Sequence, residues 1–405
     1  MRKAGRGAVV AATEGRESWR GRPGDCGGQV RGGVTLFTAL AAGIALPLLA
    51  AVLPDDRADA LYHAYDGGGV KVTGPSLQIL KRIGQSLALS GNYYVDAISS
   101  ASIDVITTAS PYSERRTETS AGLQYLAGKS IMSLGYTHSD ESDFDANSAY
   151  FNISQSMFGD LTTVTLGYSL GWDTVGKTGQ PDFSEDVDRQ QYRVGLSQIL
   201  SRDWIVDLAY EGITDEGFLN NPYRSVRYLD PTTPIGYSYE PEQYPHTRTS
   251  NAFAVRSKYF LPYRAALHGE YRFYDDTWGI RAHTAEVGYT HPWKERWIFD
   301  VKYRYYTQGH ADFYSDLFPR AQAQNFLARD KELSSFDSHT LGVGASYEFL
   351  RDRSGIERGT LNLSYDHILF AYDDFRDLTV AMTPGEEPQY DFTAGVLRLY
   401  LSVWY

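Results

Sequence analysis

Residues 390–405 read YDFTAGVLRLYLSVWY and end the chain on an aromatic side chain. Counting back in steps of two gives an apolar row, and the positions between carry mixed side chains. The apolar row consists of Leu397, Leu399, Leu401, Val403 and Tyr405. A period of two places such rows on opposite faces of a β-strand. An amphipathic last strand that stops on an aromatic residue is typical of the assembly signal of bacterial outer-membrane β-barrels, so we expect these five residues to direct assembly.

The composition favours a barrel over a helical membrane protein. The chain has 405 residues, 31 of them Tyr, and its mean hydropathy is −0.38. Membrane helices need roughly 20 consecutive apolar residues, whereas a barrel strand turns only every second residue to lipid. Tyrosine also suits the boundary between hydrocarbon and water.

The first sixty residues have the parts of a secretory signal. Residues 1–33 are rich in Arg and Gly, residues 34–53 are mostly apolar, and small residues surround position 60. We therefore predict a cleavable targeting segment over 1–60, cut after Ala60. A single membrane anchor is the alternative, and a true start near residue 30 would explain the long basic region. The only cysteine, Cys26, lies in this segment, so no disulfide or thiol site is expected.

Fourteen segments between residues 84 and 405 alternate apolar with polar or small residues, and each is long enough to cross a bilayer. They are 85–96, 115–126, 130–140, 148–158, 161–173, 189–199, 203–213, 249–260, 264–275, 281–292, 296–308, 338–350, 358–371 and 390–405. Short and long connections alternate between them, as in barrels with short periplasmic turns and long outer loops.

This pattern predicts an all-β fold over 84–405, a transmembrane antiparallel up-and-down β-barrel of fourteen strands. Residues 61–83 are assigned to a periplasmic or lumenal segment, although a strand pair there remains open, and a strand from 70–81 would allow sixteen. A soluble sandwich also has alternating strands, but it requires neither the signal sequence nor the aromatic end.

If the apolar rows face lipid, charged residues of both signs face the lumen. The candidates are Arg193, Asp207, Glu211, Arg256, Lys258, His268, Glu270, Arg272, Glu286, Asp300, Lys302, Arg304, Glu348, Asp366 and Arg398. Apart from His268, basic and acidic members balance. Pores that select one sign of ion carry a surplus of the other sign, so the balance favours cross-strand ion pairs that brace the wall. A substrate pathway along the same side chains is the alternative.

Two long loops contain candidate mouth residues. The loop 214–248 holds Tyr223, Arg224 and Arg227, which we expect to fold as a lid over the mouth, with ligand binding as the alternative. In a second loop, His310, Asp312, Ser315 and Asp316 invite a weak hydrolase interpretation. Acidic clusters such as Glu141, Asp143 and Asp145 are interpreted as solvated loops rather than calcium sites.

The sequence supplies no strong signal for other chemistry. The nine His residues show no close metal-ligand spacing, and no nucleophile-elbow motif occurs. We therefore predict no catalytic residues, no metal and no cofactor. The net charge of −12 argues against a nucleic-acid partner.

Several long motifs resemble the family catalogued as domain of unknown function 3570 (DUF3570). They are LYHAYDGGGV (61–70), YYVDAISSASIDV (93–105), FLNNPYRSVRY (218–228), YRFYDDTWGIRAHT (271–284) and YRYYTQGHADFYSDLFPR (303–320). The resemblance implies an outer-membrane barrel of a Gram-negative bacterium without an assigned activity. Family members tend to be encoded beside small lipoproteins, thioredoxin-like proteins and flavin transferases, which implies a periplasmic lipoprotein or redox partner.

Together these observations predict a channel or scaffold in the outer membrane of a Gram-negative bacterium, serving a small solute or a periplasmic partner. Its expected partners are outer-membrane lipid and the barrel-assembly machinery. The alternatives are a barrel enzyme acting on lipid or surface polymer, and a plugged structural barrel that serves a periplasmic redox system.

Overall fold

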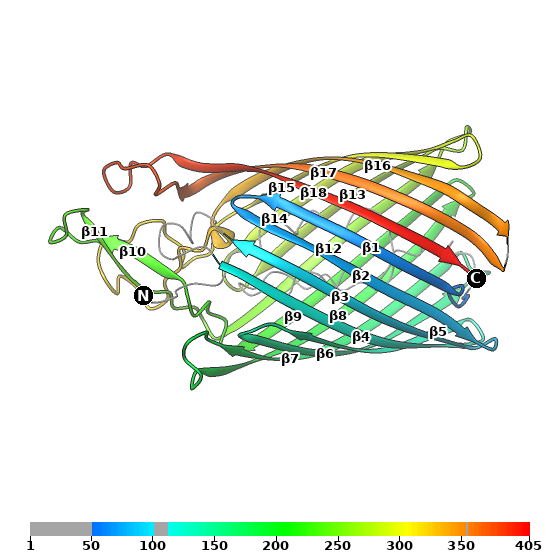
Figure 1. The fold of residues 1–405 in the computed structure, drawn as a ribbon, viewed down its shortest axis with the longest axis horizontal. Helices are drawn as coiled ribbons and strands as arrows, with labels where there is room; N and C mark the ends of the chain where they lie inside the picture. The colour runs from blue at the N-terminus through cyan, green and yellow to red at the C-terminus, as the bar shows by residue number, and fades with distance from the viewer. Residues whose placement is uncertain (1–50, 101–111, 354) are drawn as a thin grey trace.

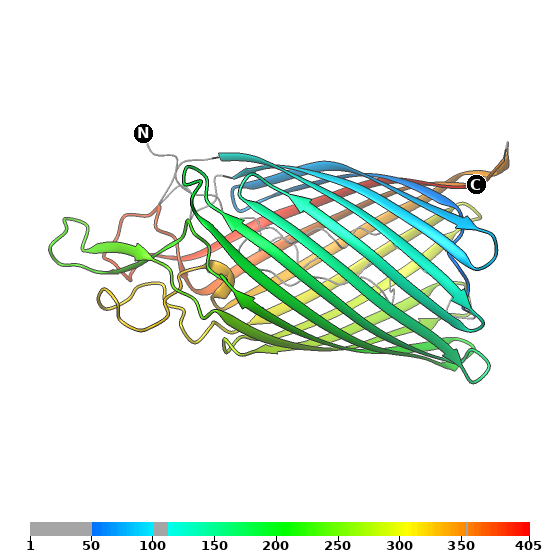
Figure 2. The same cartoon turned by 90° about the horizontal axis from the view of Figure 1, so that it is seen from below.

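A computed structural model describes residues 51–100, 112–353 and 355–405. Within these residues, strands of alternating burial form a single closed antiparallel barrel, which Figures 1 and 2 show from two sides. Each wall strand hydrogen-bonds to its sequence neighbours, except that β9 pairs with β12 and β1 closes the ring against β18. Across these same residues no helix has the length and apolarity needed to cross a membrane.

The wall strands are β1 (Arg57–Gly67), β2 (Val70–Ile83), β3 (Leu87–Ser100), β4 (Tyr112–Ala127), β5 (Ser130–Asp140), β6 (Phe144–Met157), β7 (Thr162–Gly176), β8 (Ser184–Ser201), β9 (Trp204–Gly217), β12 (Thr247–Phe260), β13 (Ala266–Asp276), β14 (Arg281–Trp293), β15 (Trp297–Gln308), β16 (Phe336–Arg353), β17 (Ile356–Arg376) and β18 (Gln389–Trp404). A separate hairpin, β10 (Ser225–Leu229) and β11 (Tyr237–Pro241), and the 3₁₀ helix η3 (Lys331–Leu333) lie in the loops.

The predicted architecture is confirmed, but the favoured count of fourteen strands is wrong. The described residues form sixteen wall strands, the count that the sequence allowed as its alternative. The two additional strands are β1 and β2, so residues 61–83 belong to the wall rather than to a tail or a lumenal segment. A cut after Ala60 would remove the first four residues of β1, which pair with β18 from Arg57 onward. Most of the predicted targeting segment, residues 1–50, lies outside the described residues.

The final strand occupies the position that its pattern predicts. Leu397, Leu399 and Leu401 are exposed on the outer face, while Val396 and Ser402 are buried on the inner face. At the chain end the Tyr405 backbone N–H donates to the Asp56 carbonyl at 3.2 Å, and the Lys81 ammonium lies 4.8 Å from the Tyr405 ring centroid. The last strand is therefore held at both its edges and its end.

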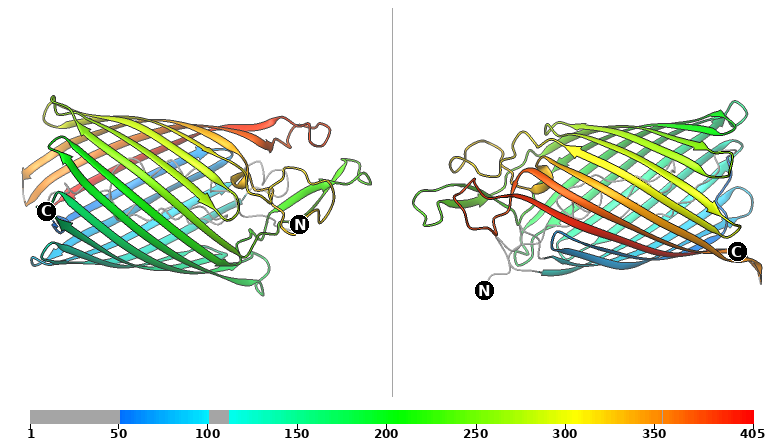
Figure 3. Two further views of the ribbon diagram at one scale, coloured as in Figure 1. Left: turned by 180° about the vertical axis from the view of Figure 1, so that it is seen from behind. Right: turned by 90° about the horizontal axis from the view of Figure 1, so that it is seen from above.

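The barrel has a turn end and a loop end. The C-terminus lies at the end where tight turns connect the strands, and the long loops gather at the opposite end (Figure 3). Glycines with positive φ, such as Gly128 (63°), allow two-residue turns that a side chain would strain. Large apolar side chains are exposed on outer positions of the wall, for example Leu166, Val194 and Leu363. An apolar outer surface of this extent marks a membrane or protein contact.

Candidate functional site

The candidate functional site is the interior of the barrel together with the loops over its mouth. The fourteen charged side chains predicted to line the lumen, and His268, are all buried or half-buried, and they lie on strand positions opposite to the exposed apolar ones. Arg193, for instance, lies between the exposed Tyr192 and Val194. Inward orientation follows from the period of two along each strand.

Ion pairs join neighbouring strands inside the barrel. Arg193 Nη2 lies 3.2 Å from Glu211 Oε1, and Arg272 Nη2 reaches Oε2 of the same glutamate at 3.8 Å. Arg256 Nε donates to Glu270 Oε2 at 2.6 Å, directly across the β12–β13 pair. Opposite charges facing each other across a ladder stabilise the pairing.

A glycine permits one pair to bridge three strands. Lys302 on β15 and Asp366 on β17 both lie opposite Gly342 on β16. The Lys302 ammonium passes over Gly342 and lies 3.4 Å from Asp366 Oδ1, and Arg398 Nη2 lies 3.1 Å from Oδ2. A Cβ at position 342 would lie within 2.5 Å of both side chains, so only glycine leaves room for this contact.

The remaining lumen candidates lie outside these pairs. Glu286 approaches the His268 ring at 3.9 Å, and Asp300 Oδ1 accepts from the Thr290 hydroxyl at 2.5 Å. Glu348 pairs with Arg351 near the turn end. Asp207, Lys258 and Arg304 also lie on the inner face of the wall.

Three loops cover the mouth, and we call them the cap: residues 218–246, 309–335 and 377–388 (Figure 1, loop end). Apolar side chains of the first two loops, such as Leu219 and Phe313, pack with the wall in a buried cluster. Tyr244, Trp278 and Phe313 form an aromatic triangle with centroid separations of 5.2–5.5 Å, joining two cap loops to the β13–β14 connection. Burial of aromatic side chains of this size stabilises a loop strongly.

A buried guanidinium ties the three cap loops together. Arg227 is fully buried and pairs with Asp316 in the second loop and Glu387 in the third. Arg329 Nη2 also lies 2.9 Å from Asp316 Oδ1. Because charges without partners are costly to bury, the three loops are held in one arrangement by these contacts.

The other predicted mouth residues divide into buried and exposed groups. Arg224 Nη1 lies 2.6 Å from Asp330 Oδ1, and both side chains are buried in the cap. Tyr223 donates its hydroxyl to the Asp143 carboxylate between β5 and β6. His310 and Asp312 are exposed at the start of the second cap loop.

The described side-chain contacts of the second loop do not join Ser315, His310 and Asp316 in the arrangement that a hydrolase requires. Asp316 is engaged by two arginines. The Ser315 hydroxyl donates to the Leu317 carbonyl at 3.1 Å, and His310 Nδ1 lies 2.9 Å from the Ala311 carbonyl. Three residues close in sequence therefore make three separate sets of contacts.

Sequence reasoning missed a polar cluster inside the loop half of the barrel. His63 Nε2 on β1 lies 2.7 Å from Asp96 Oδ1 and 2.9 Å from the Tyr94 hydroxyl on β3. Arg116 Nη2 on β4 donates to Glu118 Oε2 at 2.6 Å. The alternation of Glu114, Arg116 and Glu118 along one strand face was the signal that could have shown a second charged row.

These features define a closed antiparallel β-barrel with an apolar outer face, a charged interior and a capped mouth. The chain belongs to the DUF3570 family of proteins of unknown function, whose match covers residues 103–359, more than half of the sequence. No curated protein matches the sequence.

Solved barrels of the outer membrane are similar to this chain. OmpT, an outer membrane protein of Vibrio cholerae, is 11% identical, with a TM-score of 0.43 over 87% of this chain and 97% of its own. A bacterial polysaccharide outer membrane secretin is 6% identical, with a TM-score of 0.46 over 85% of this chain and 97% of its own. The siderophore receptor PirA of Pseudomonas aeruginosa is 10% identical, with a TM-score of 0.42 over 80% of this chain, which spans 60% of that receptor.

Proposed function

We propose that this protein is a gated passage for a small polar solute across the outer membrane of a Gram-negative bacterium, with the cap as its closed gate. The exposed apolar wall suits outer-membrane lipid, and the last strand suits recognition by the barrel-assembly machinery. The observation that carries the proposal is the fully buried Arg227, which joins all three cap loops through Asp316 and Glu387.

Ion pairs inside the cap favour a gate over a permanent plug. Buried ion pairs contribute little stability compared with apolar packing of the same volume, yet they specify one arrangement of the groups that make them. A two-state element held by such contacts can be biased by a solute, by a partner or by pH. Beneath the cap, the charged pairs of the wall offer polar side chains to a solute in transit.

Conductance of the purified protein in a planar bilayer tests this proposal. We expect the wild type to remain mostly closed, with rare openings. Replacement of Arg227 by methionine leaves Glu387 without its guanidinium and Asp316 with Arg329 alone, so openings should become frequent. Arg320, an exposed arginine of the second cap loop, provides the matched control, and Arg320→Met should behave as the wild type. A steadily open wild type, or an Arg227→Met variant as silent as the wild type, contradicts a gate.

A second candidate function is a scaffold for a periplasmic lipoprotein or redox protein. The hairpin of β16 and β17 favours it, because these two strands, of 18 and 21 residues, extend past the neighbouring turns at the turn end (Figure 1). Deletion of residues 350–357 should then abolish co-purification of a thioredoxin-like protein or lipoprotein while conductance stays unchanged. Co-purification that survives the deletion would count against this surface.

A further inference from the structure

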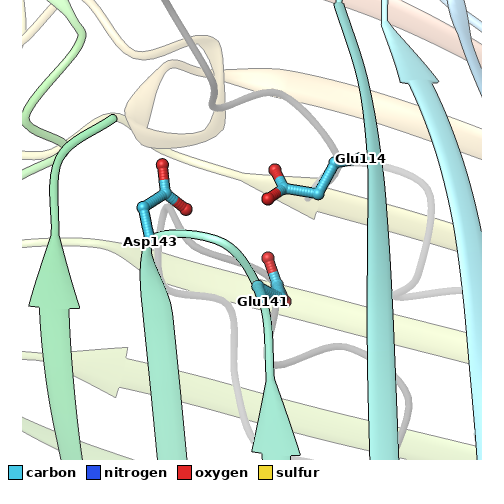
Figure 4. Close-up of side chains that lie close together, drawn as sticks. All are labelled: Glu114, Glu141 and Asp143. Atoms are coloured by element: carbon cyan, nitrogen blue, oxygen red, sulfur yellow. The ribbon is translucent and has the colours of Figure 1, made fainter. Parts of the chain in front are cut away.

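Three carboxylates converge beside the mouth, where β4 meets the connection between β5 and β6. Figure 4 shows Glu114, Glu141 and Asp143 pointing toward one another from these elements. One oxygen of each carboxylate lies within 4.8 Å of the other two. Glu114 comes from β4, whereas Glu141 and Asp143 come from residues 141–143, the connection between β5 and β6.

Glu141 supplies an independent reason to expect a cation. Its side chain is 4% exposed, and its Oε1 has no hydrogen-bond partner within the described parts of the chain. The nearest guanidinium, Arg116, lies 2.6 Å from Glu118 but 3.9 Å from Glu141 Oε1. Arg116 therefore neutralises Glu118, and the buried oxygen of Glu141 lacks the close donor that a buried carboxylate requires.

Three convergent protein carboxylates suit calcium better than magnesium. A triangle whose sides are at most 4.8 Å has its centre within about 2.8 Å of each corner, so the three oxygens lie within reach of one calcium ion, whose bonds to oxygen are about 2.3–2.6 Å. Magnesium takes ligands at about 2.0–2.1 Å in near-ideal octahedral geometry and usually keeps several waters, so it is usually bound through one or two carboxylates rather than three. Each carboxylate can also bind through both oxygens, which helps to reach the six or more ligands that calcium takes.

The other contacts of the cluster hold its members in place. The Ser142 backbone N–H and hydroxyl both donate to Glu114 Oε1, at 3.2 and 2.5 Å. The Tyr223 hydroxyl donates to Asp143 and accepts from the Thr178 backbone N–H at 2.6 Å. Tyr223 belongs to the first cap loop, so the cluster is connected directly to the cap.

We propose that Glu114, Glu141 and Asp143 form a calcium site that fastens the first cap loop to the wall through Tyr223. A bound calcium ion supplies the positive charge that Glu141 lacks and fixes Asp143, the acceptor of the Tyr223 hydroxyl. With three protein carboxylates, the affinity should fall in the range of extracellular calcium modules, with a Kd of about 10⁻⁴–10⁻³ M. The evidence for this site comes from the contacts of its own residues and does not depend on whether the barrel conducts.

Calorimetric titration of the detergent-purified full chain, stripped of lipopolysaccharide, with CaCl₂ tests the proposal. We expect one saturable site in the wild type and at least about tenfold weaker binding in Glu141→Gln and in Asp143→Asn, the loss typical of damaged metal shells. Asp182→Asn, which changes an exposed carboxylate in the neighbouring loop, should bind as the wild type does. The heat-modifiable shift in gel mobility shows that each variant is folded.

Three results would overturn the proposal. The first is an absence of saturable calcium binding in the wild type. The second is unchanged affinity in both folded variants, which would place the ion elsewhere. The third is displacement of calcium by an equal concentration of MgCl₂, which would contradict the assignment to calcium. As a further readout, calcium should slow proteolysis of the first cap loop in the wild type, and Tyr223→Phe should remove that protection while retaining binding.

Discussion

Arg227 and Glu387 lie 160 positions apart in the sequence, yet Arg227 Nη1 donates to Glu387 Oε1 at 2.5 Å inside the cap. The same guanidinium also meets Asp316, so one side chain joins three loops. A buried charge that loses its partner destabilises a protein by about 3–5 kcal/mol, which is enough to change the population of a loop arrangement.

We predict that Arg227→Met opens the cap while leaving the wall intact. The variant leaves Glu387 buried without its guanidinium and Asp316 with Arg329 alone, so the loops should separate to hydrate the uncompensated carboxylate. Limited proteolysis should cut residues 218–246 and 309–335 at least about tenfold faster than in the wild type, in line with a loss of more than about 1.4 kcal/mol. Arg320→Met should leave the rate unchanged. Equal cleavage rates for wild type and Arg227→Met would show that the ion pairs do not hold the cap.

Cap stability should decrease as pH rises from about 5 to about 8. Burial and the nearby Asp330 carboxylate raise the pKa of Glu242 to about 7, although Arg224 opposes the shift. The unfolded loop has a lower pKa for this carboxyl, so the folded cap binds the extra proton between the two values and loses stability as that proton leaves. Hydrogen exchange of the first cap loop measures the effect.

Glu242→Gln is the matched variant for this pH dependence. Its amide oxygen can accept from the Arg329 backbone N–H, and its NH₂ can donate to the Tyr244 hydroxyl oxygen, so both contacts of Glu242 are retained, but the amide does not titrate. Protection factors, which correct the exchange rates for their intrinsic dependence on pH, should be nearly flat over the same range in the variant. A wild-type profile that is equally flat, or one in which the cap tightens as pH rises, would refute the assignment to Glu242.

The lumen should change its ion preference when Asp366 is neutralised. Asp366→Asn leaves Lys302 and Arg398 inside the barrel without the carboxylate that they share. A surplus of positive charge attracts anions, so reversal potentials, recorded in the Arg227→Met background, should shift toward anion selectivity. Asp373→Asn, at an exposed position on the same strand, is the control. An unchanged reversal potential would place the conducting path away from these side chains.

A charge on the outer row of the last strand should impair assembly. Leu397 lies midway along β18 on the exposed face, where arginine costs about 2–4 kcal/mol in lipid. We expect Leu397→Arg to reduce the heat-modifiable barrel in the outer-membrane fraction. Asp391→Arg changes the same row near the loop end and should assemble normally. Normal assembly of both variants would argue against lipid contact at Leu397.

Much of the fold could be predicted because every strand of a barrel repeats the same alternation of outward apolar and inward polar or small side chains. All fourteen predicted segments appear as β3–β9 and β12–β18. β1 and β2 were left open as an alternative rather than predicted, for physical reasons. The small residues Ala58 and Ala60 resemble a cleavage site, while Gly74 and Pro75 interrupt the alternation of β2 and argue against a strand. The structure nevertheless places Pro75 opposite Tyr62 in the barrel wall.

The candidate site was less predictable because contacts depend on register between strands. Alternation identified the side chains of Lys302 and Asp366 as inward-facing, but their contact depends on Gly342 lying between them. The ion pairs of the cap lie in loops. Loops lack the two-residue periodicity of strands, so the sequence pattern does not predict their paths. The arginines at 224 and 227 indicated a lid, whereas their acidic partners only became known from the structure.

A reversible lock on the cap tests the gate most directly. Gln243 and Leu327 exchange backbone hydrogen bonds of 2.9 and 2.7 Å between the first and second cap loops. Such a pair suits an engineered disulfide. In an Arg227→Met background that also carries Cys26→Ser, Gln243→Cys combined with Leu327→Cys would be recorded in a planar bilayer before and after reduction. We predict a silent oxidised protein and frequent openings after reduction, and identical conductance in both states would contradict a gate formed by the cap.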